Sequence, residues 1–200
     1  MMIDTALQDI ERTEQGANGV FTLAQFKDAG VSVTSVRRAV LRGELERVAR
    51  GVYQLPECLD DEMYNSQLHR RQMIYSHDTA LYLHGLNDRD PLRYSVTVPT
   101  GYNTKRLVEA GFKVFSLKKE LQEQDIEDVK TSYGHFVRTY NLERTICDCL
   151  RSRNRLQSEI VFSGLKGYVK RSNRNLSLLM KNAEKFGVAT LLRTYLDVLL

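Results

Sequence analysis

The sequence is poor in the residues that mark secreted, metal-binding or membrane-spanning proteins. Its 200 residues include no tryptophan, three prolines and three cysteines, which are Cys58, Cys147 and Cys149. So few cysteines exclude a disulfide framework, and their spacing matches no tetrahedral zinc site. No apolar run approaches the ~20 residues that a membrane-spanning helix needs, and the acidic N-terminal segment does not resemble a secretory signal. We therefore expect a cytoplasmic protein with no metal and no membrane partner.

The charge of the chain is unevenly distributed. Hydrophobic residues make up 42% and charged residues 27% of the sequence, which is typical of one or two globular domains. The net charge is +4, but residues 151–200 alone carry ten basic and three acidic side chains. A second excess of basic residues lies within residues 31–55. Two separate basic regions make a polyanionic partner a hypothesis to test against the motifs.

Turn signals divide the first 56 residues into short elements. Apolar spacing predicts helices over residues 3–14, 23–29 and 33–42, with Thr22 and Ser32 as the N-caps of the second and third. Residues 45–55 then predict two strands that meet at Arg50-Gly51. Three short helices followed by a hairpin are the element order of a winged helix-turn-helix. We assign residues 1–56 to such a DNA-binding domain.

The rest of the chain, residues 57–200, predicts a mixed α+β domain that ends in helices. Helices are expected near residues 60–73, over residues 77–86 with Ser76 as the N-cap and a break at Gly85, and over residues 103–110, with strands over residues 94–98 and 112–117. Two more strands meet at Gly134. From Leu142 onward the pattern is helical, with a break at Gly187. The predicted fold class is therefore α+β throughout.

The side chains of the third helix separate into two faces at 100° per residue. Val36, Ala39 and Val40 share the face that packs. The opposite side carries Thr34, Ser35, Arg38 and Arg42, with Arg37 on its flank. Arginines and small hydroxyls suit a major groove, because guanidinium groups can bind guanine and no carboxylate repels the phosphates.

The hairpin adds Arg47 and Arg50 beside a glycine turn, where cations can contact the minor groove or phosphates. The alternative is that these charges form only a solvated surface, but the helix order, the caps and the hairpin together favour DNA binding. We assign Glu44 and Glu46 to helix termination or to pairing with nearby arginines. The predicted DNA-binding residues are Thr34, Ser35, Arg37, Arg38, Arg42, Arg47 and Arg50.

Three sequence blocks resemble the AbiEi-type antitoxins of bacterial type IV toxin–antitoxin and phage abortive-infection systems. The first block is the winged-helix segment, GVFTLAQFKDAGVS followed by GELERVARGVYQLP. The second is SHDTALYLHGL at residues 76–86, and the third is YNLERTICDCL at residues 140–150. Winged helices are common, so the first block alone is a weak signal. All three in order are specific, and they span nearly the whole chain.

The resemblance implies a bifunctional, non-enzymatic protein without a cofactor. Its N-terminal domain would repress its own operon by binding inverted repeats in the promoter. Its C-terminal antitoxin domain would counteract a nucleotidyltransferase-like toxin, without a stable complex between the two proteins. The DNA-contacting role carries over to the same seven residues that the helical geometry selects.

Enzymatic chemistry in the second domain is the competing hypothesis. Asp125, Glu127, Asp128 and Lys130 form an acidic and lysine-containing stretch like those of metal-dependent nucleases, but no distant carboxylate partner is evident. No glycine-rich phosphate loop is present, and an unconventional phosphoryl transfer remains open. His77 and His84 lie two helical turns apart, too far for a shared metal, so we interpret both as structural.

Two further pairs on the predicted helix from Leu142 are interpreted as structural. Cys147 and Cys149 point about 200° apart on a helix, which favours two separate small apolar residues. Arg144 and Asp148 are four residues apart and predict an ion pair.

The last fifty residues carry a predicted basic surface on helices whose other faces are apolar. This surface is either a solvated exterior or a functional patch that contacts nucleic acid or the toxin's acidic substrate. Its residues are Lys166, Lys170, Arg171, Arg174, Lys181 and Lys185.

Overall fold

The computed structural model describes residues 7, 8, 10 and 19–199, which divide into two compact units. The first unit contains residues 1–71 and 130–137, and the second contains residues 72–129 and 138–200. The chain therefore leaves the first unit and returns to it for one short segment. The helix predicted over residues 3–14 lies largely outside the described residues. The functional division at residue 56 stays a prediction.

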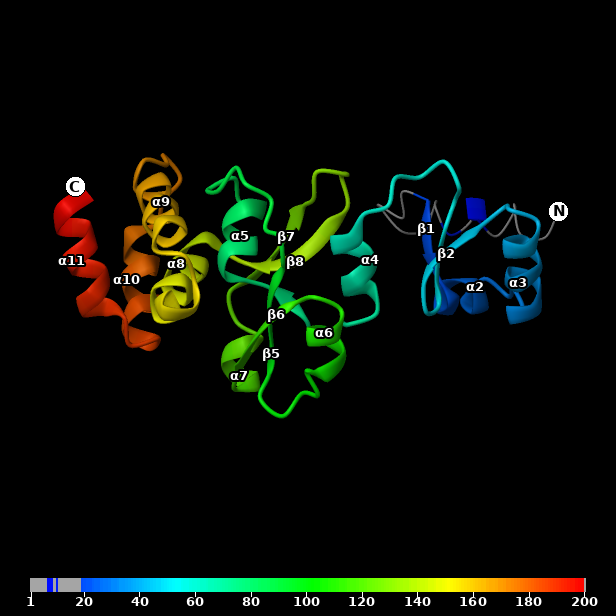
Figure 1. The fold of residues 1–200 in the computed structure, drawn as a ribbon, viewed down its shortest axis with the longest axis horizontal. Coiled ribbons are helices and arrows are strands. Elements are labelled where there is room, and N and C mark those ends of the chain that lie inside the picture. The colour runs from blue at the N-terminus through cyan, green and yellow to red at the C-terminus, as the bar shows by residue number, and fades with distance from the viewer. Residues whose placement is uncertain (1–6, 9, 11–18, 200) are drawn as a thin grey trace. The chain divides into compact units, whose positions relative to one another are not determined.

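Residues 20–54 of the first unit form a three-stranded antiparallel sheet and two helices (Figure 1). The strands are β1 (Val20–Thr22), β2 (Glu46–Ala49) and β3 (Val52–Gln54), in the order β1-β3-β2. Helices α2 (Leu23–Asp28) and α3 (Val33–Leu41) lie between β1 and β2 in the sequence. Both helices and the β2–β3 hairpin confirm the predicted elements. Strand β1 was not predicted, because three residues carry no periodic signal.

Local side-chain contacts start both helices where the sequence predicts. Thr22 and Gln25 form a reciprocal capping box at α2. The Oγ of Ser32 accepts a hydrogen bond from the backbone N of Ser35 at 3.1 Å and starts α3. Gly51 has a φ of +75° at the β2–β3 turn, a conformation that favours glycine. These elements share an apolar core, which includes Phe21, Phe26, Val36, Ala39 and Leu45.

Helix α4 (Glu62–Leu68) and the segment 130–137 are joined by a buried polar cluster in the first unit. Asp61 caps α4 through a 3.1 Å hydrogen bond from the backbone N of Tyr64. The other carboxylate oxygen accepts from Thr131 at 2.5 Å and lies 2.9 Å from Nδ1 of His135. The His135 ring also stacks on Tyr64, with centroids 4.4 Å apart. A single carboxylate therefore connects segments that are 70 residues apart.

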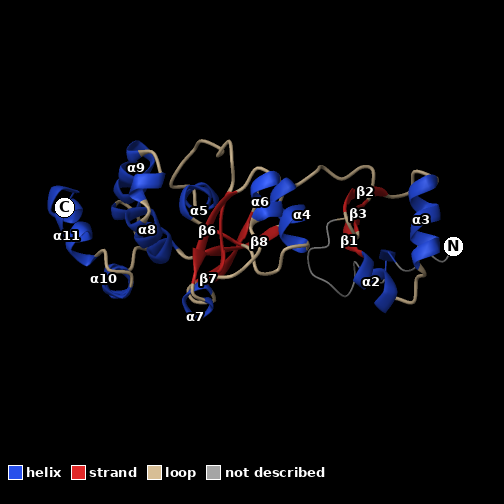
Figure 2. Ribbon diagram, turned by 60° about the horizontal axis from the view of Figure 1, so that its bottom comes forward, coloured by secondary structure: helices blue, strands red, loops and turns tan. Residues whose placement is uncertain are grey.

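The second unit is built on a mixed sheet of five strands in the order β6-β5-β4-β8-β7. Its strands are drawn in red in Figure 2, where β6, β7 and β8 are labelled. Strands β4 and β5 are antiparallel, whereas β5–β6 and β4–β8 are parallel. The strands are β4 (Ile74–Tyr75), β5 (Ser95–Pro99), β6 (Lys113–Leu117), β7 (Ile126–Lys130) and β8 (Phe136–Tyr140). Helix α4 ends at Leu68, so it is shorter than the helix predicted near residues 60–73, and β4 begins directly after that segment.

Helices surround this sheet and form the C-terminal part of the unit. They are α5 (His77–Leu83), α6 (Lys105–Glu109), α7 (Lys119–Gln122), α8 (Leu142–Arg151), η1 (Arg153–Arg155), α9 (Ser158–Val169), α10 (Leu176–Lys185) and α11 (Ala189–Leu199). Helix α8 packs against α5, α9, α10 and α11, and nearly all its residues are buried. The mixed α+β class is confirmed. Across residues 7–8, 10 and 19–199, no helix is both long and apolar enough to cross a membrane.

Candidate nucleic-acid interface and buried polar network

Helix α3 presents a polar face opposite its buried one. Val36 and Ala39 are completely buried in the first unit. Thr34, Arg37 and Arg38 are exposed. Among the described residues, neither of these two arginines forms an ion pair with a carboxylate. Their charges are therefore available to an anionic partner.

On α3 and at its C-cap, two members of the predicted DNA-binding set have side-chain partners inside the unit. The Oγ of Ser35 lies 2.9 Å from the Oγ of Ser32, so it takes part in the N-terminal cap. Arg42 forms a bidentate pair with Glu44, at 2.7 and 2.8 Å. The hydrogen bond from Arg42 lowers the pKa of Glu44. The predicted pairing of Glu44 with an arginine is thus present, and it neutralises the cation at the end of α3.

Leu41 lies on the same side of α3 as the arginines and is 86% exposed. Leu41 adds an apolar side chain to the arginines and hydroxyls predicted for this face, so the predicted set is incomplete at this position. At 100° per residue Leu41 falls between Arg37 and Thr34, so the angular pattern contained the signal. The face therefore combines cations with one apolar side chain.

The β2–β3 hairpin places two more cations in solvent. Arg47 and Arg50 are both exposed. The Nε of Arg47 donates to the carbonyl of Ala49 at 3.3 Å, which holds that side chain along the strand before the turn. The backbone N of Leu23 donates to the carbonyl of Gly51 at 2.8 Å, so the turn is attached to the start of α2. Both arginines are thus carried by a turn with a defined backbone.

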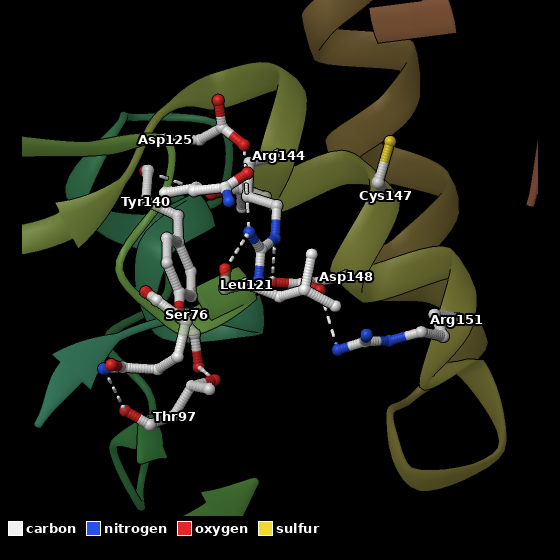
Figure 3. Close-up of polar contacts among 12 residues, drawn as sticks. Ser76, Thr97, Leu121, Asp125, Tyr140, Arg144, Cys147, Asp148 and Arg151 are labelled. Atoms are coloured by element: carbon white, nitrogen blue, oxygen red, sulfur yellow. Dashed lines mark hydrogen bonds and ion pairs between the residues drawn. The ribbon is translucent and has the colours of Figure 1, made fainter. Parts of the chain in front are cut away.

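The second unit contains a buried ionic network centred on α8, and Figure 3 shows Arg144 and Arg151 converging on Asp148. The Nε of Arg144 donates to Asp148 at 2.9 Å, and both side chains are fully buried. Arg151 contacts the other oxygen of Asp148 at 2.9 Å. Burial raises the pKa of the Asp148 carboxyl, and the two arginines oppose that rise. The predicted ion pair of Arg144 and Asp148 is confirmed.

The Arg144 guanidinium is also held by groups outside α8. It donates to the carbonyl of Leu121 at 3.0 Å. Its central carbon lies 4.2 Å from the Tyr140 ring centroid and 4.0 Å from that of Phe186. Asp125 lies 3.8 Å from the guanidinium and contacts Lys185 on α10. The network therefore connects α7, β8, α8 and α10.

The histidines of the second unit make separate contacts within the fold. His77 is completely buried, with Nδ1 2.8 Å from the Oγ of Ser76 and Nε2 3.0 Å from the Oγ of Ser152. Ser76 therefore makes no side-chain cap to α5, contrary to prediction. His84 lies 2.7 Å from the carbonyl of Tyr140. Burial is the main cause that lowers the pKa of both histidines.

The residues considered for nuclease chemistry do not form one cluster. Asp125 belongs to the buried network, Glu127 lies 3.5 Å from His84, and Asp128 is exposed on β7. No group of three or more histidine, cysteine, aspartate or glutamate side chains in the described part of the chain is arranged to hold a metal ion. Cys147 and Cys149 are both buried, and burial raises the pKa of each thiol. They behave as two small core residues.

The C-terminal basic residues come from α9, the following loop and α10. Lys166, Lys170 and Lys181 are exposed. Arg171 donates to the carbonyl of His84, and Lys185 donates to Gln124, so these two cations have fixed positions. The remaining member, Arg174, donates to the carbonyl of Arg171 at 2.9 Å. Three of the six predicted residues are thus tethered within the unit.

Comparison with known proteins supports the family resemblance over the N-terminal segment. Residues 8–56 match a family described as a transcriptional regulator, AbiEi antitoxin, which confirms the resemblance there. The fold is similar to the crystal structure of the RV2827C protein from Mycobacterium tuberculosis, with a TM-score of 0.55 and 13% identity over 96% of this chain and 80% of that chain. At this identity the likeness shows the fold alone. No curated protein matches the sequence.

Substitution of Asp148 by Asn should strongly destabilise the second unit. The substitution leaves the buried Arg144 guanidinium without its anionic partner, which costs about 3–5 kcal/mol. Chemical denaturation measures the change in the free energy of unfolding. Glu184→Gln is the matched control, because it breaks the exposed Glu184–Arg193 pair and should cost about 0–1 kcal/mol. Equal small losses in the two variants would contradict a dependence on the buried pair.

The buried histidines should make the protein less stable as the pH falls below about 6.5, the ordinary histidine pKa. Below this pH both histidines take up a proton in the unfolded chain, whereas burial of His77 and His84 opposes protonation in the folded protein. Each histidine therefore lowers the free energy of unfolding, with a limiting slope of about 1.4 kcal/mol per pH unit. His77→Asn should reduce this slope between pH 7.5 and 5.5, and asparagine tolerates the φ of +55° at this position. Urea denaturation at several pH values measures it. An unchanged slope in the variant would show that His77 does not contribute.

Proposed function

We propose that this protein is the antitoxin of a type IV toxin–antitoxin system and that it represses its own operon. Residues 1–56 would form a winged helix-turn-helix that binds inverted repeats in the promoter. Residues 57–200 would counteract a nucleotidyltransferase-like toxin without forming a stable complex. Neither activity requires catalysis by this chain, and both act in the bacterial cytoplasm, where promoter DNA is found. The same system would serve phage defence by abortive infection.

One observation carries the DNA-binding part of this proposal. The face of α3 that carries the unpaired Arg37 and Arg38 lies within residues 8–56, the segment that matches the family of antitoxin transcriptional regulators. The order β1-α2-α3-β2-β3 supports a winged helix, because the hairpin follows the exposed helix directly. Arg47 and Arg50 on that hairpin supply the cations that a wing needs.

The side chains of the α3 face suggest distinct roles on DNA. Arg38 can form a bidentate contact with guanine O6 and N7, while Arg37 and Thr34 can bind phosphates or base edges. Leu41 can contact a thymine methyl group, which would add preference for thymine at one position. Arg42 and Ser35 would contribute less, since Glu44 and Ser32 already hold them. Arg47 and Arg50 would contact phosphates or the adjacent minor groove.

Arg38→Ala should weaken binding to the promoter repeats by about 1–3 kcal/mol and relax the base preference at one position, because it removes a base contact. A gel-shift titration at fixed salt, with single-base variants of the repeat, measures both effects. Lys27→Ala is the control, since Lys27 is an exposed cation of the same unit on α2. Unchanged affinity and base preference for Arg38→Ala would refute the assignment.

The two proposed activities should separate in the full-length chain. The Arg38→Ala protein should still rescue cells from the toxin encoded beside it, because its second unit is intact. Growth during toxin co-expression measures rescue, and a promoter–reporter fusion measures repression in the same cells. Rescue that falls in parallel with repression, at equal protein level, would contradict this division of labour.

A further inference from the structure

A cavity in the second unit is lined by residues that belong neither to the buried network nor to α3. Its volume is about 590 Å³, within the range of pockets that hold small ligands. Four parts of the chain line it: Asp78 near the start of α5, the loop 87–93, Lys113 at the start of β6, and residues 154–157 with Ile160. All of them belong to the second unit.

The lining of this cavity carries more positive than negative charge. Four basic side chains line the cavity, compared with two acidic side chains, Asp78 and Asp90. Within residues 7–8, 10 and 19–199, none of the four forms an ion pair with a carboxylate. The cations are Arg89, Arg93, Lys113 and Arg155.

Backbone carbonyls hold three of these cations in place without neutralising them. The Nε of Arg93 donates to the carbonyl of Gly111 at 2.8 Å. The Nζ of Lys113 donates to the carbonyl of Arg155 at 2.5 Å, and Arg155 in turn donates to the carbonyl of Val114 at 3.0 Å. A carbonyl is a dipole and cancels no formal charge, so the cavity retains its positive potential. This arrangement places cations before an anion arrives.

Aromatic stacking fixes Arg155 further. Its guanidinium carbon lies 4.1 Å from the Phe115 ring centroid. The buried His77 ring is stacked on the same phenyl ring, with centroids 3.5 Å apart. Burial is the largest cause that lowers the pKa of His77, and the charges of Arg151, Lys113 and Arg155 lower it further. Two of the cavity cations, Lys113 and Arg155, thus lie close enough to His77 to oppose its protonation.

We propose that this cavity binds the phosphate groups of a nucleotide, either free or at the end of a nucleic-acid strand. Arg89, Arg93, Lys113 and Arg155 would contact the phosphates. Amide groups that could bind the base or the sugar come from Asn87, Asn154 and Gln157. An apolar wall for the base is formed by Leu92, Leu156 and Ile160. Guanidinium groups suit phosphate oxygens because each can donate two parallel hydrogen bonds.

A neighbouring cavity of about 660 Å³ shows why the phosphates belong in the first one. It shares Arg89 with the first cavity but adds Asp88 and Glu159. Its charged lining is therefore net negative, and phosphate would be repelled there. The two cavities also share Asn87, Gln157 and Ile160, so a base could extend from one toward the other. The proposal does not depend on DNA recognition by α3.

Isothermal titration calorimetry on the full-length protein in EDTA tests the proposal with ATP, AMP and adenosine. ATP should bind more tightly than AMP, and adenosine should bind at least tenfold more weakly than ATP, because it lacks the charged groups. A trinucleotide RNA with or without a 5′-phosphate forms the second arm. Binding of ATP places the ligand among free nucleotides, and binding of the phosphorylated trinucleotide alone places it at a strand end.

The variants Arg89→Gln and Arg89→Gln/Lys113→Gln locate the site. The Arg89 side chain makes no hydrogen bond or ion pair within the described part of the chain, so Arg89→Gln should leave the melting temperature unchanged and weaken binding several-fold. The double variant should weaken it by at least about tenfold, as expected for loss of charged hydrogen bonds. Arg106→Gln, an exposed cation on α6 outside the cavity, should bind as the parent does.

Three outcomes would overturn the proposal. The first is that neither ATP nor the phosphorylated trinucleotide binds at millimolar concentration. The second is that adenosine binds as tightly as ATP, which would make the phosphates irrelevant. The third is that Arg106→Gln weakens binding as much as Arg89→Gln, which would indicate non-specific attraction. Gel shifts with the promoter repeats should be unchanged in Arg89→Gln, so a failure here is distinguishable from a failure of DNA binding.

Discussion

Arg144 and Asp148 carry opposite charges in the interior of the second unit, where either alone would be costly. Their contact lets α8 pass through the unit with nearly every residue buried. The guanidinium also reaches Leu121 and lies against Tyr140 and Phe186, so the sheet and α10 are positioned by the same group. Arg155, which lines the cavity, comes shortly after the end of α8 in the sequence. The position of α8 therefore also affects the shape of the proposed ligand site.

Elements with strong local signals could be predicted from the sequence. Helix α3 combines a serine cap with apolar residues at helical spacing, and both features are present. The pair Arg144 and Asp148 follows from a four-residue separation on a helix. The polar face with Arg37 and Arg38 follows from the same periodicity. In each case the residues that carry the signal lie within one or two helical turns of each other. The feature can therefore be predicted without knowing any long-range contact.

The remaining features depend on contacts between distant segments. Strands β1 and β4 have three and two residues, and they exist because other strands pair with them. Ser76 was predicted as a helix cap, yet its hydroxyl is bound to His77 and Thr97. The cationic cavity brings together residues from position 78 to position 160, which no spacing rule connects. Leu41 differs, because its place on the exposed face follows from the helical periodicity of α3 alone.

The cluster formed by Asp61, Thr131 and His135 makes the first unit discontinuous in sequence. A crossover after residue 71 would take Asp61 from one parent and Thr131 and His135 from the other, so the two parents would have to match at this cluster. A crossover between residues 56 and 61 would instead move α3 and its hairpin as one contiguous piece and leave all three cluster residues in the same chain. Substitutions of the exposed side chains on α3 likewise leave the cluster intact, so this surface can vary independently of the contacts that join the two segments of the unit.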